Sequence, residues 1–535
     1  MRRAALLVAA GLALTPAAAV ADQTTGRLLV TLRPAAGPPH AVAAHVGARV
    51  QRAIPRLGVL TVKPRAGETL RALAHRLARD PSVASVHPER RFELRYVPDD
   101  PAFTQPGPDP GTIAEWWAAR QNFPAAWDIT QGGGARVAII DTGADATHPE
   151  LAGRIIESAD FDDNPTHGGA GTDEVGHGTH VASLACAAPD NEVGLAGAGL
   201  DCRLLVAKSD LSEGSVAQAL VWAADRGAQA INMSFGTDGG APASGVVIDA
   251  LHYAARRGAV LVAAAADSPA EEQGDPANVL QPTGTGADMT RNLGLSVTAA
   301  NAMDVRAPFA GRGSQISMAA YGTFGSGPAA GLLGAFPGTP TDLERGSALP
   351  PASPCECRAV FGGDPRYANL QGTSMAAPVI AAVGALARNL NPDLSASDVV
   401  RILKTTARRP AGGWSPELGW GILDARAALA AARATDRRAP VSRLRAPRLR
   451  GRSILLRWTG ADTAPPGARA SGIVRYEVWR AVARAAPRRV AVTARTSLRV
   501  RGRRGVRYTF FTIAVDRAGN REAPPSRPDA RVRVR

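Results

Sequence analysis

Short apolar runs and helix-like periods alternate over residues 27–94. The runs at Leu28–Leu32, Val59–Val62 and Val83–Val86 predict strands, whereas the periods at Ala41–Val50 and Leu70–Leu77 predict helices. This pattern indicates a small split β-α-β module, a ferredoxin-like unit of the α+β class.

A much longer unit follows a segment without any period. Residues 96–111 are rich in Pro and Gly, so we expect an exposed linker that is open to proteolytic processing. From Arg136 onward, continuous apolar strands alternate with helices, which predicts a parallel sheet covered on both faces. The expected strands are Val137–Ile140, Leu204–Ala207, Ala230–Ser234 and Val260–Ala265, and the expected helices include Ser215–Arg226 and Val246–Arg257. This α/β unit is expected to close within Leu418–Ala432.

The pattern changes again near the C-terminus. Residues 433–450 are rich in Arg and Pro and have no apolar period, which indicates a linker, placed at 435–447. Strand alternation then returns, bounded by turn residues, and predicts a β-sandwich over 448–535. Its expected strands are Ser453–Trp458, Arg475–Arg480, Val490–Thr493 and Tyr508–Val515.

The first 21 residues have the pattern of a secretory signal peptide. Arg2 and Arg3 precede an apolar stretch from Ala4 to Leu14, and small residues follow up to Ala21. The apolar core is shorter than the ~20 residues that a membrane-spanning helix needs. We therefore expect a secreted protein without a membrane anchor.

The net charge of +15 is concentrated in the C-terminal region. From Asp436 to Arg535 there are 26 Arg and 6 acidic residues, a charge of +20, which leaves −5 for the rest. A bias in base composition would also produce many arginines, since the chain has only three lysines. The region lacks interleaved aromatics and a base-reading motif, so specific nucleic-acid recognition is not expected.

Four cysteines occur in a chain that we expect to be exported, so disulfides are permitted. Three pairings are open, and Cys186 with Cys202 is the preferred pair. Free thiols remain an alternative, and Cys355-Glu-Cys357 alone is weak support for a metal site.

Three segments combine residues suited to nucleophilic catalysis. Asp141 ends an apolar strand, where active sites of parallel sheets form, although a helix cap is an alternative. His177 stands between Gly176 and Gly178, immediately before an apolar helical run. Ser374 begins a long apolar helix whose N-terminus favours negative charge, although it could serve as an N-cap.

Together these segments resemble the Asp, His and Ser segments of the subtilase family, in the same order. The resemblance covers 98–434 and implies a subtilisin-like three-layer domain that hydrolyses peptide bonds through an acyl-enzyme, with Asp141, His177 and Ser374 as the triad. Residues 22–97 resemble the inhibitory propeptide of the family, which is removed by autoprocessing. The C-terminal unit resembles fibronectin type III-like modules.

The same resemblance assigns the substrate positions. Backbone pairing with an edge strand gives broad recognition of peptides. The edge strand would be Ser234, Phe235 and Gly236, and the opposite wall of the P1 pocket would be Ala264, Ala265 and Ala266.

One position departs from the family pattern. Asp267 stands where an Asn normally donates to the oxyanion, and an ionised carboxylate would repel that charge. A protonated Asp267 could still donate, whereas loss of one donor costs roughly 10² to 10³ in turnover. The Thr373 hydroxyl and the Ser374 N–H are expected to remain as donors.

A calcium site is a further implication of the resemblance. Its expected ligands are the side chains of Glu150 and Asn191 and the carbonyls of Pro189, Val193 and Leu195. Glu replaces the usual Asp at 150, and a solvated polar loop remains the alternative. No cofactor is expected for catalysis.

These features support an active, autoprocessing extracellular endopeptidase that acts on proteins or peptides, with a monomer as the simplest state. The alternative is a subtilase-fold binding protein that is disabled by Ala266 and Asp267. A third, narrower hypothesis is that the basic C-terminal module holds the protein on an anionic cell-surface polymer, or on nucleic acid, through phosphate-type contacts.

Overall fold

The computed structural model describes residues 24–33, 48–65, 67–90, 96–237, 239, 244–325, 330–348, 353–409, 412–464, 470–483 and 485–535. The chain divides into two compact units, Met1–Arg95 and Tyr96–Arg535. The expected signal peptide lies outside the described residues.

The first unit is an antiparallel sheet with a helix packed on it. Its strands, in the order β2-β3-β1-β4, are β1 (Thr24–Leu32), β2 (Arg49–Ile54), β3 (Val59–Lys63) and β4 (Val83–Arg90). Helix α2 (Leu70–Leu77) buries Leu73 and Leu77 against β1, and Thr69 caps its N-terminus. This strand order is that of a ferredoxin-like unit.

The predicted helix Ala41–Val50 is wrong at its C-terminal end. Arg49 and Val50 begin strand β2, in which Val50 pairs with Val62 of β3, while residues 41–47 lie outside the described part. Pairing with a distant strand overrides the local period here.

A seven-stranded parallel sheet forms the centre of the second unit. Its order is β11-β10-β9-β8-β5-β7-β6. The strands are β5 (Arg136–Asp141), β6 (Ile155–Phe161), β7 (Arg203–Ser209), β8 (Ala230–Met233), β9 (Val260–Ala264), β10 (Leu295–Ala300) and β11 (Met318–Tyr321). The predicted strands are confirmed in position.

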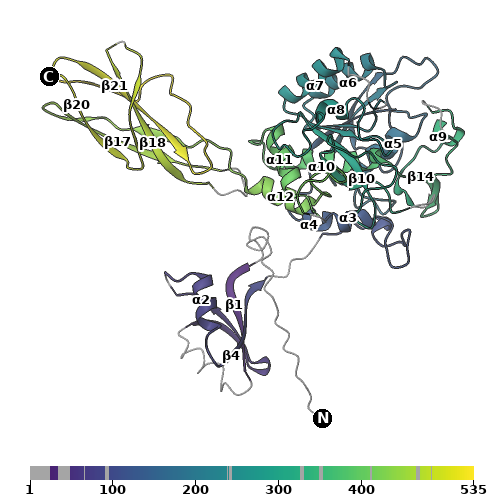
Figure 1. Ribbon diagram of the computed structural model, residues 1–535, viewed down its shortest axis with the longest axis horizontal. Coiled ribbons are helices and arrows are strands. Elements are labelled where there is room, and N and C mark those ends of the chain that lie inside the picture. Colours follow the sequence, from purple (N-terminus) through teal and green to yellow (C-terminus); the bar gives the residue numbers. More distant parts are fainter. Residues whose placement is uncertain are drawn as a thin grey trace. The chain divides into compact units, whose positions relative to one another are not determined.

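Helices cover both faces of this sheet (Figure 1). One layer is α5 (His177–Cys186), α10 (Thr373–Leu390), α11 (Ala396–Thr406) and α12 (Ala425–Ala434), and the other is α6 (Glu213–Asp225), α7 (Gly245–Arg256) and α8 (Ala277–Leu280). Along β5, Val137 and Ile139 pack toward the first layer, and Ala138 and Ile140 pack toward the second. Since successive side chains point to opposite faces, an entirely apolar strand belongs between two layers.

Among the described helices, α10 is long and apolar enough to cross a membrane, but most of it is buried inside the domain. The first unit also contains the short 3₁₀ helix η2 (Pro55–Leu57). The short helices of the second unit are η3 (Pro101–Phe103), α3 (Trp116–Arg120), α4 (Phe123–Trp127) and α9 (Asp342–Arg345). A small antiparallel sheet in the same unit has the order β12 (Leu332–Ala335), β14 (Asp364–Leu370), β13 (Arg358–Phe361).

The C-terminal region forms two antiparallel sheets around one apolar core, consistent with the predicted β-sandwich. One sheet contains β15 (Val441–Leu444), β17 (Ser453–Ala461), β16 (Arg448–Arg450) and β20 (Ser497–Arg501), and the other β19 (Arg488–Thr493), β18 (Ile473–Val482), β21 (Arg507–Asp516) and β22 (Ala530–Arg533).

The predicted linker 435–447 is too long. Strand β15 lies inside it, and Leu444 pairs with Trp458 of β17. The strand buries Ser442 and Leu444 on one face, but two alternations are too few to be distinguished from a linker in sequence.

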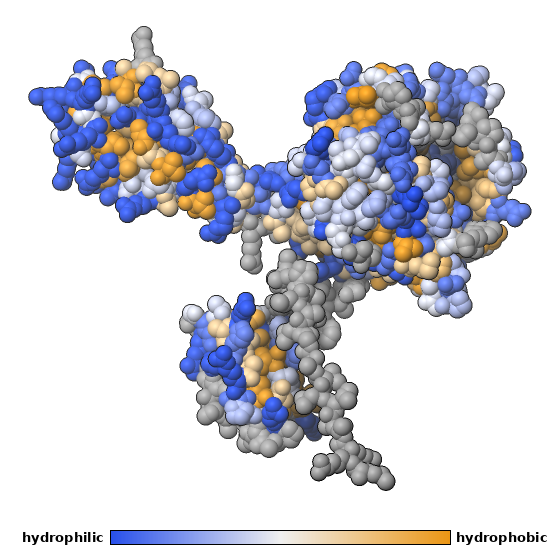
Figure 2. Space-filling view, in the orientation of Figure 1, coloured by the Kyte–Doolittle hydropathy of each residue, from blue (hydrophilic) through white to orange (hydrophobic). Residues whose placement is uncertain are grey.

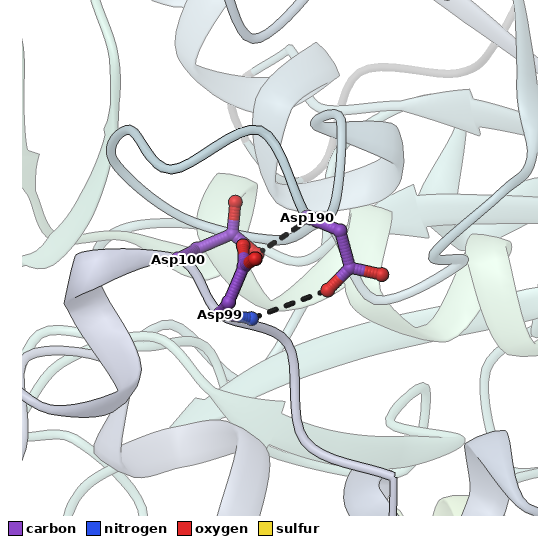
Figure 3. Close-up of side chains that lie close together, drawn as sticks. All are labelled: Asp99, Asp100 and Asp190. Atoms are coloured by element: carbon purple, nitrogen blue, oxygen red, sulfur yellow. Dashed lines mark hydrogen bonds between the residues drawn. The ribbon is translucent and has the colours of Figure 1, made fainter.

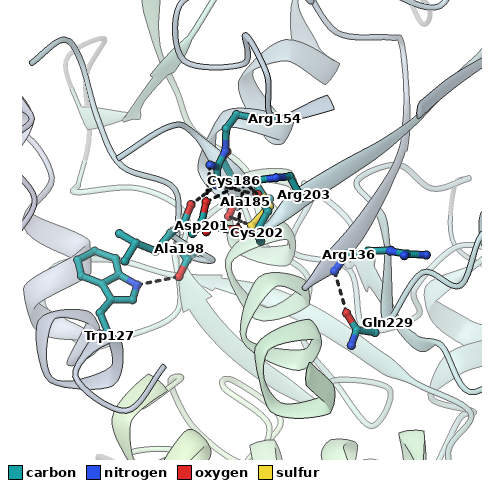
Figure 4. Close-up of a disulfide and its surroundings, with 11 residues drawn as sticks. Trp127, Arg136, Arg154, Ala185, Cys186, Ala198, Asp201, Cys202, Arg203 and Gln229 are labelled. Carbon is teal, nitrogen blue, oxygen red and sulfur yellow. Dashed lines mark hydrogen bonds and ion pairs between the residues drawn. A yellow bond between two sulfur atoms is a disulfide. The ribbon is translucent and has the colours of Figure 1, made fainter. Parts of the chain in front are cut away.

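Two disulfides are present, and Cys186–Cys202 confirms the preferred pair, while the other joins Cys355 to Cys357. Around the first, the Arg154 guanidinium donates to the Cys186 and Cys202 carbonyls and pairs with Asp201 at 2.9 Å (Figure 4).

Candidate active site

The structure places Asp141 at the C-terminal end of central strand β5. The residue is 1% exposed, and its Oδ1 accepts hydrogen bonds from the Thr142 N–H and from His177 Nδ1, both at 2.8 Å. Its Oδ2 is buried without a partner in the described contacts. The carboxylate therefore orients the imidazole and favours the tautomer that leaves Nε2 free to accept a proton.

His177 is the first residue of α5, and two glycines allow this position. Gly176 has a φ of 92°, and a Cβ on Gly178 would lie 2.1 Å from the Gly143 carbonyl oxygen. The first turn of α5 can thus press directly onto the loop that follows β5. Burial disfavours the imidazolium, but attraction to Asp141 and Asp173 outweighs it and raises the pKa of His177.

Asp173 is a site residue that sequence reasoning missed. It is buried, and its carboxylate accepts hydrogen bonds from Gly176 N–H (2.8 Å), Thr179 N–H (2.8 Å), Thr179 Oγ1 (2.7 Å) and Thr142 Oγ1 (2.9 Å). These bonds join the start of α5 to the loop after β5. An acidic residue four positions before His177 was the available signal, because a helix N-terminus attracts carboxylates.

Ser374 lies in the first turn of α10, facing the end of β8. Its Oγ donates to the Ser234 carbonyl oxygen at 2.9 Å, and the Ser234 hydroxyl donates to the Ser374 carbonyl at 2.8 Å. No hydrogen bond joins Ser374 to His177 in the described part of the chain. Contact between the two side chains would need a rotation of Ser374, and long or missing contacts of this kind are common in sites without substrate.

Asp267 lies beside the start of α10, as expected for the oxyanion position. Its Oδ1 accepts a hydrogen bond from the Thr373 N–H at 2.7 Å. The residue as a whole is exposed, yet desolvation of its carboxyl group raises its pKa above the ordinary value, and the Thr373 N–H and His177 oppose that shift. The carboxyl group is held as an acceptor at a position where catalysis needs a donor.

The Thr373 hydroxyl, for which an oxyanion role is expected, donates to another group in this structure. Thr373 is 1% exposed, and its Oγ1 donates to the Ala265 carbonyl oxygen at 2.6 Å. The Ser374 N–H, in contrast, is in the first helical turn, where N–H groups lack helical acceptors. The backbone donor is therefore available, and the hydroxyl donor is occupied.

The two expected substrate walls flank the nucleophile. Ser234 follows β8, and no backbone hydrogen bond is found for Phe235 or Gly236 among the described contacts, which leaves an edge for a peptide. Ala264 ends β9, while the Ala265 N–H and the Ala266 carbonyl bond to neighbouring segments and make this wall rigid.

Comparison with known proteins identifies the family. Residues 132–421 match the Subtilase family. The chain belongs to the subtilase family. Among similar relatives, thermitase of Thermoactinomyces vulgaris is 30% identical over 322 residues, which cover 59% of this chain and 94% of thermitase. The extracellular protease of Xanthomonas campestris pv. campestris is 29% identical over 406 residues, 67% of this chain and 61% of the relative.

A protease of Pseudoalteromonas arctica is a similar solved structure, with a TM-score of 0.49, 26% identity, and coverage of 61% of this chain and all of the other. Subtilases are serine proteases that act without a catalytic cofactor, and this chain is assigned to that class of peptidase.

In this subtilase, the predicted calcium loop lies against Glu150. Glu150 Oε1 accepts hydrogen bonds from Leu195 N–H (3.0 Å) and Tyr367 Oη (2.9 Å), and the Asn191 amide lies 3.4 Å from Oε2. A Cβ on Gly194 would lie 1.8 Å from Oε1, so glycine makes room for the longer acid. Burial raises the pKa of Glu150 to about 8.

Further acidic residues, which the sequence reasoning missed, gather around the same loop. Ligand oxygens of Asp99, Asp100 and Asp190 lie within 4.8 Å of one another (Figure 3). Asp100 and Glu115 are buried, and each has one carboxylate oxygen without a hydrogen-bond partner in the described contacts. Burial raises the pKa of Asp100 to about 6 and that of Glu115 well above its usual range. Unpaired buried carboxylates of this kind fit a cation.

Proposed function

We propose that this subtilase is a secreted serine endopeptidase whose triad is Asp141, His177 and Ser374. The hydrogen bond of 2.8 Å between Asp141 and His177, at the end of the central sheet and beside the N-terminus of α10, carries the proposal. An acid that holds an imidazole next to a serine at a helix N-terminus is the arrangement that acyl transfer requires.

In the proposed reaction, Ser374 Oγ turns from Ser234 toward His177, and Nε2 takes its proton as Oγ attacks the peptide carbonyl carbon. The Ser374 N–H donates to the oxyanion, the imidazolium then gives its proton to the leaving amine, and water hydrolyses the acyl-enzyme by the reverse sequence of proton transfers. Asp141 stabilises the imidazolium throughout.

We further propose that residues 22–97 are an inhibitory propeptide that the enzyme removes itself. The ferredoxin-like strand order of the first unit and the boundary of the compact units at Arg95, close to the expected one, support this role. The test is expression of the full precursor beside Ser374→Ala, with propeptide release and casein hydrolysis followed in both. The variant should remain unprocessed and inactive, and equal behaviour of the two proteins would contradict the protease function.

The second candidate is a subtilase-fold binding protein with little turnover. The occupied Thr373 hydroxyl and the acceptor geometry of Asp267 favour it, since they leave the Ser374 N–H as the clearest donor to the oxyanion. A purified, processed protein that binds peptides but fails to release casein fragments would support this candidate.

Calcium is proposed as a structural ion of the loop near Glu150. The carbonyls of Pro189, Val193 and Leu195 accept no backbone hydrogen bond in the described contacts, so they are available as ligands beside Asn191. A bound divalent cation would neutralise the buried acids around it.

Finally, the C-terminal module is proposed to attach the enzyme to an anionic polymer outside the cell, on the basis of its charge of +20.

A further inference from the structure

Both sheets of the C-terminal sandwich expose arginines, but among the described residues an ion-paired acid lies on one of them. On the sheet β19-β18-β21-β22, Glu477 pairs with Arg489 at 3.1 Å and with Arg521 at 2.8 Å, and it also accepts from the Trp479 indole. This acid offsets one positive charge, while Arg475, Arg488, Arg507 and Arg531 of the same sheet have no ion pair among the described residues. Figure 2 shows hydrophilic side chains projecting along the outline of this module, in the orientation where Figure 1 labels β17, β18, β20 and β21.

The other sheet places several arginines on one face. In β16, β17 and β20, one row is Arg448–Leu455–Arg499. The next row is Arg450–Ser453–Arg501. The four arginines are exposed, while the residues between them along each strand are half-buried. Because partners in a sheet point to the same side, both rows lie on the outward face, and exposed Arg457 extends it along β17.

We define the arginine face as Arg448, Arg450, Arg457, Arg499 and Arg501, and among the described residues no acidic side chain pairs with it. The six acids of residues 436–535 bond elsewhere, and their partners are Arg438 and Ser471 for Asp436, Gly472 for Asp462, Arg489 and Arg521 for Glu477, Asn520 for Asp516, Ser442 and Ala514 for Glu522, and Leu444 and Thr512 for Asp529. None of the five arginines takes part in an ion pair found among the described residues.

The arginines of β16 and β20 are not direct neighbours, because β17 lies between them, and their like charges repel across that strand. The Cα atoms of residues two apart along a strand are separated by about 6.7 Å in ideal geometry. The Cα atoms of paired positions on β16 and β20 are separated by about 9.5 Å across β17. The face thus presents five guanidinium groups on one side of the sheet, and each can bind the free oxygens of a phosphodiester in a bidentate manner.

We propose that this arginine face is the surface by which the module binds a flexible linear phosphodiester polymer that carries no bases, of the poly(glycerol phosphate) kind. The inference rests on the proposed attachment role and assigns it to one face and one ligand chemistry. A duplex is a poorer fit, because the face has no helix or ribbon that enters a groove. Single-stranded nucleic acid is also a poorer fit, since Leu455, rather than an aromatic ring, lies between the arginines.

The test uses the full chain carrying Ser374→Ala, which removes self-cleavage, and synthetic poly(glycerol phosphate) as the immobilised probe. The face variant changes Arg448, Arg450, Arg499 and Arg501 to Gln. The matched control changes four exposed arginines of the other sheet to Gln and so has the same net charge: Arg475, Arg488, Arg507 and Arg531. Urea unfolding checks that both remain folded, and Kd is measured over a range of salt concentrations.

We expect the face variant to bind at least about 10-fold more weakly near 0.1 M salt. The slope of log Kd against log salt concentration should fall by about 3, because four phosphate contacts are lost at roughly 0.7 each. The control should stay within about threefold of the parent at that salt concentration. Equal losses of affinity in the two variants would contradict the assignment to this face, because net charge alone would then explain the binding. A parent protein that does not bind the polymer at all would contradict the attachment role itself.

Two competitors test the ligand chemistry. Single-stranded oligothymidylate and polygalacturonate, at equal total charge, should displace the protein less effectively than soluble poly(glycerol phosphate). Stronger competition by oligothymidylate would assign the face to single-stranded nucleic acid, and stronger competition by polygalacturonate would assign it to a carboxylate polymer; either result would overturn the proposed ligand.

Discussion

Replacement of Asp267 by Asn exchanges one carboxylate oxygen for an NH₂ group beside the nucleophile. Asp267 Oδ1 accepts the Thr373 N–H at 2.7 Å, and an Asn oxygen can retain this bond while its NH₂ group becomes a new donor. The Thr373 hydroxyl is bonded to the Ala265 carbonyl at 2.6 Å and would have to break that bond to donate instead. The substitution thus adds one oxyanion donor without removing a contact.

The size of the effect follows from the donor that is gained. One oxyanion donor contributes about 10² to 10³ in turnover. Asp267 donates only when it is protonated, so in the wild type this donor is lost as the pH rises through its pKa, which burial raises. We therefore expect Asp267→Asn to raise kcat by roughly 10²-fold above that pKa and to make little difference below it.

The same substitution also changes the requirement for a neutral base. The charge of Asp267 helps to raise the pKa of His177, which must be neutral to accept the serine proton. Removing that charge lowers the pKa of His177. The acid limb of kcat/KM should therefore move to lower pH in the variant.

The assay compares processed wild type, Asp267→Asn and Asp267→Ala on a chromogenic peptide between about pH 4 and 10, with concentrations set by active-site titration. The Ala variant is the control, because it removes the carboxylate without adding a donor. An unchanged or lower kcat for the Asn variant at neutral pH, or an equal gain for Ala, would refute the reasoning.

Three further predictions concern the surroundings of the site. Asp173→Asn should lower the free energy of unfolding, measured in urea, by about 2–4 kcal/mol, because an NH₂ group then faces hydrogen-bond donors. It should also lower the pKa of His177 and so shift the acid limb of kcat/KM to lower pH. An unshifted acid limb would contradict the electrostatic role of Asp173. Replacing both Cys186 and Cys202 by Ala should lower the free energy of unfolding by about 3 kcal/mol, since this disulfide has a sequence separation of 16. Removing the Cys355–Cys357 disulfide in the same way should lower it clearly less, because its sequence separation is 2. Chelation of calcium should lower Tm, and calcium at about 100 times its Kd should restore roughly 2.7 kcal/mol of unfolding free energy. Glu150→Gln should reduce this response to calcium. A Tm that does not depend on calcium would contradict the proposed site.

The local pattern of apolar and polar residues was sufficient to predict most of the strands and helices of the subtilisin-like domain. The runs Val137–Ile140 and Val260–Ala265 are entirely apolar because both faces of their strands are buried, so the parallel sheet could be predicted from sequence. The segments around Asp141, His177 and Ser374 are short and contiguous, and they indicated the family that the comparison then showed. The catalytic roles of these residues stay predictions.

Other features depended on partners that are distant in sequence. Strand β2 forms because Val50 pairs with Val62, and β15 because Leu444 pairs with Trp458, although neither segment has a distinct period of its own. The Thr373 hydroxyl was expected to be a donor to the oxyanion, but the Ala265 carbonyl occupies it.

The sequence by itself determined the layers of the domain, the candidate triad and the excess of arginine near the C-terminus, because periodicity, motifs and charge are local properties of a chain. Tertiary structure decided which donors remain free at the oxyanion, how Asp173 supports His177, and which arginines share a face without an acid. These depend on hydrogen bonds and charge pairs between segments that are brought together only by folding.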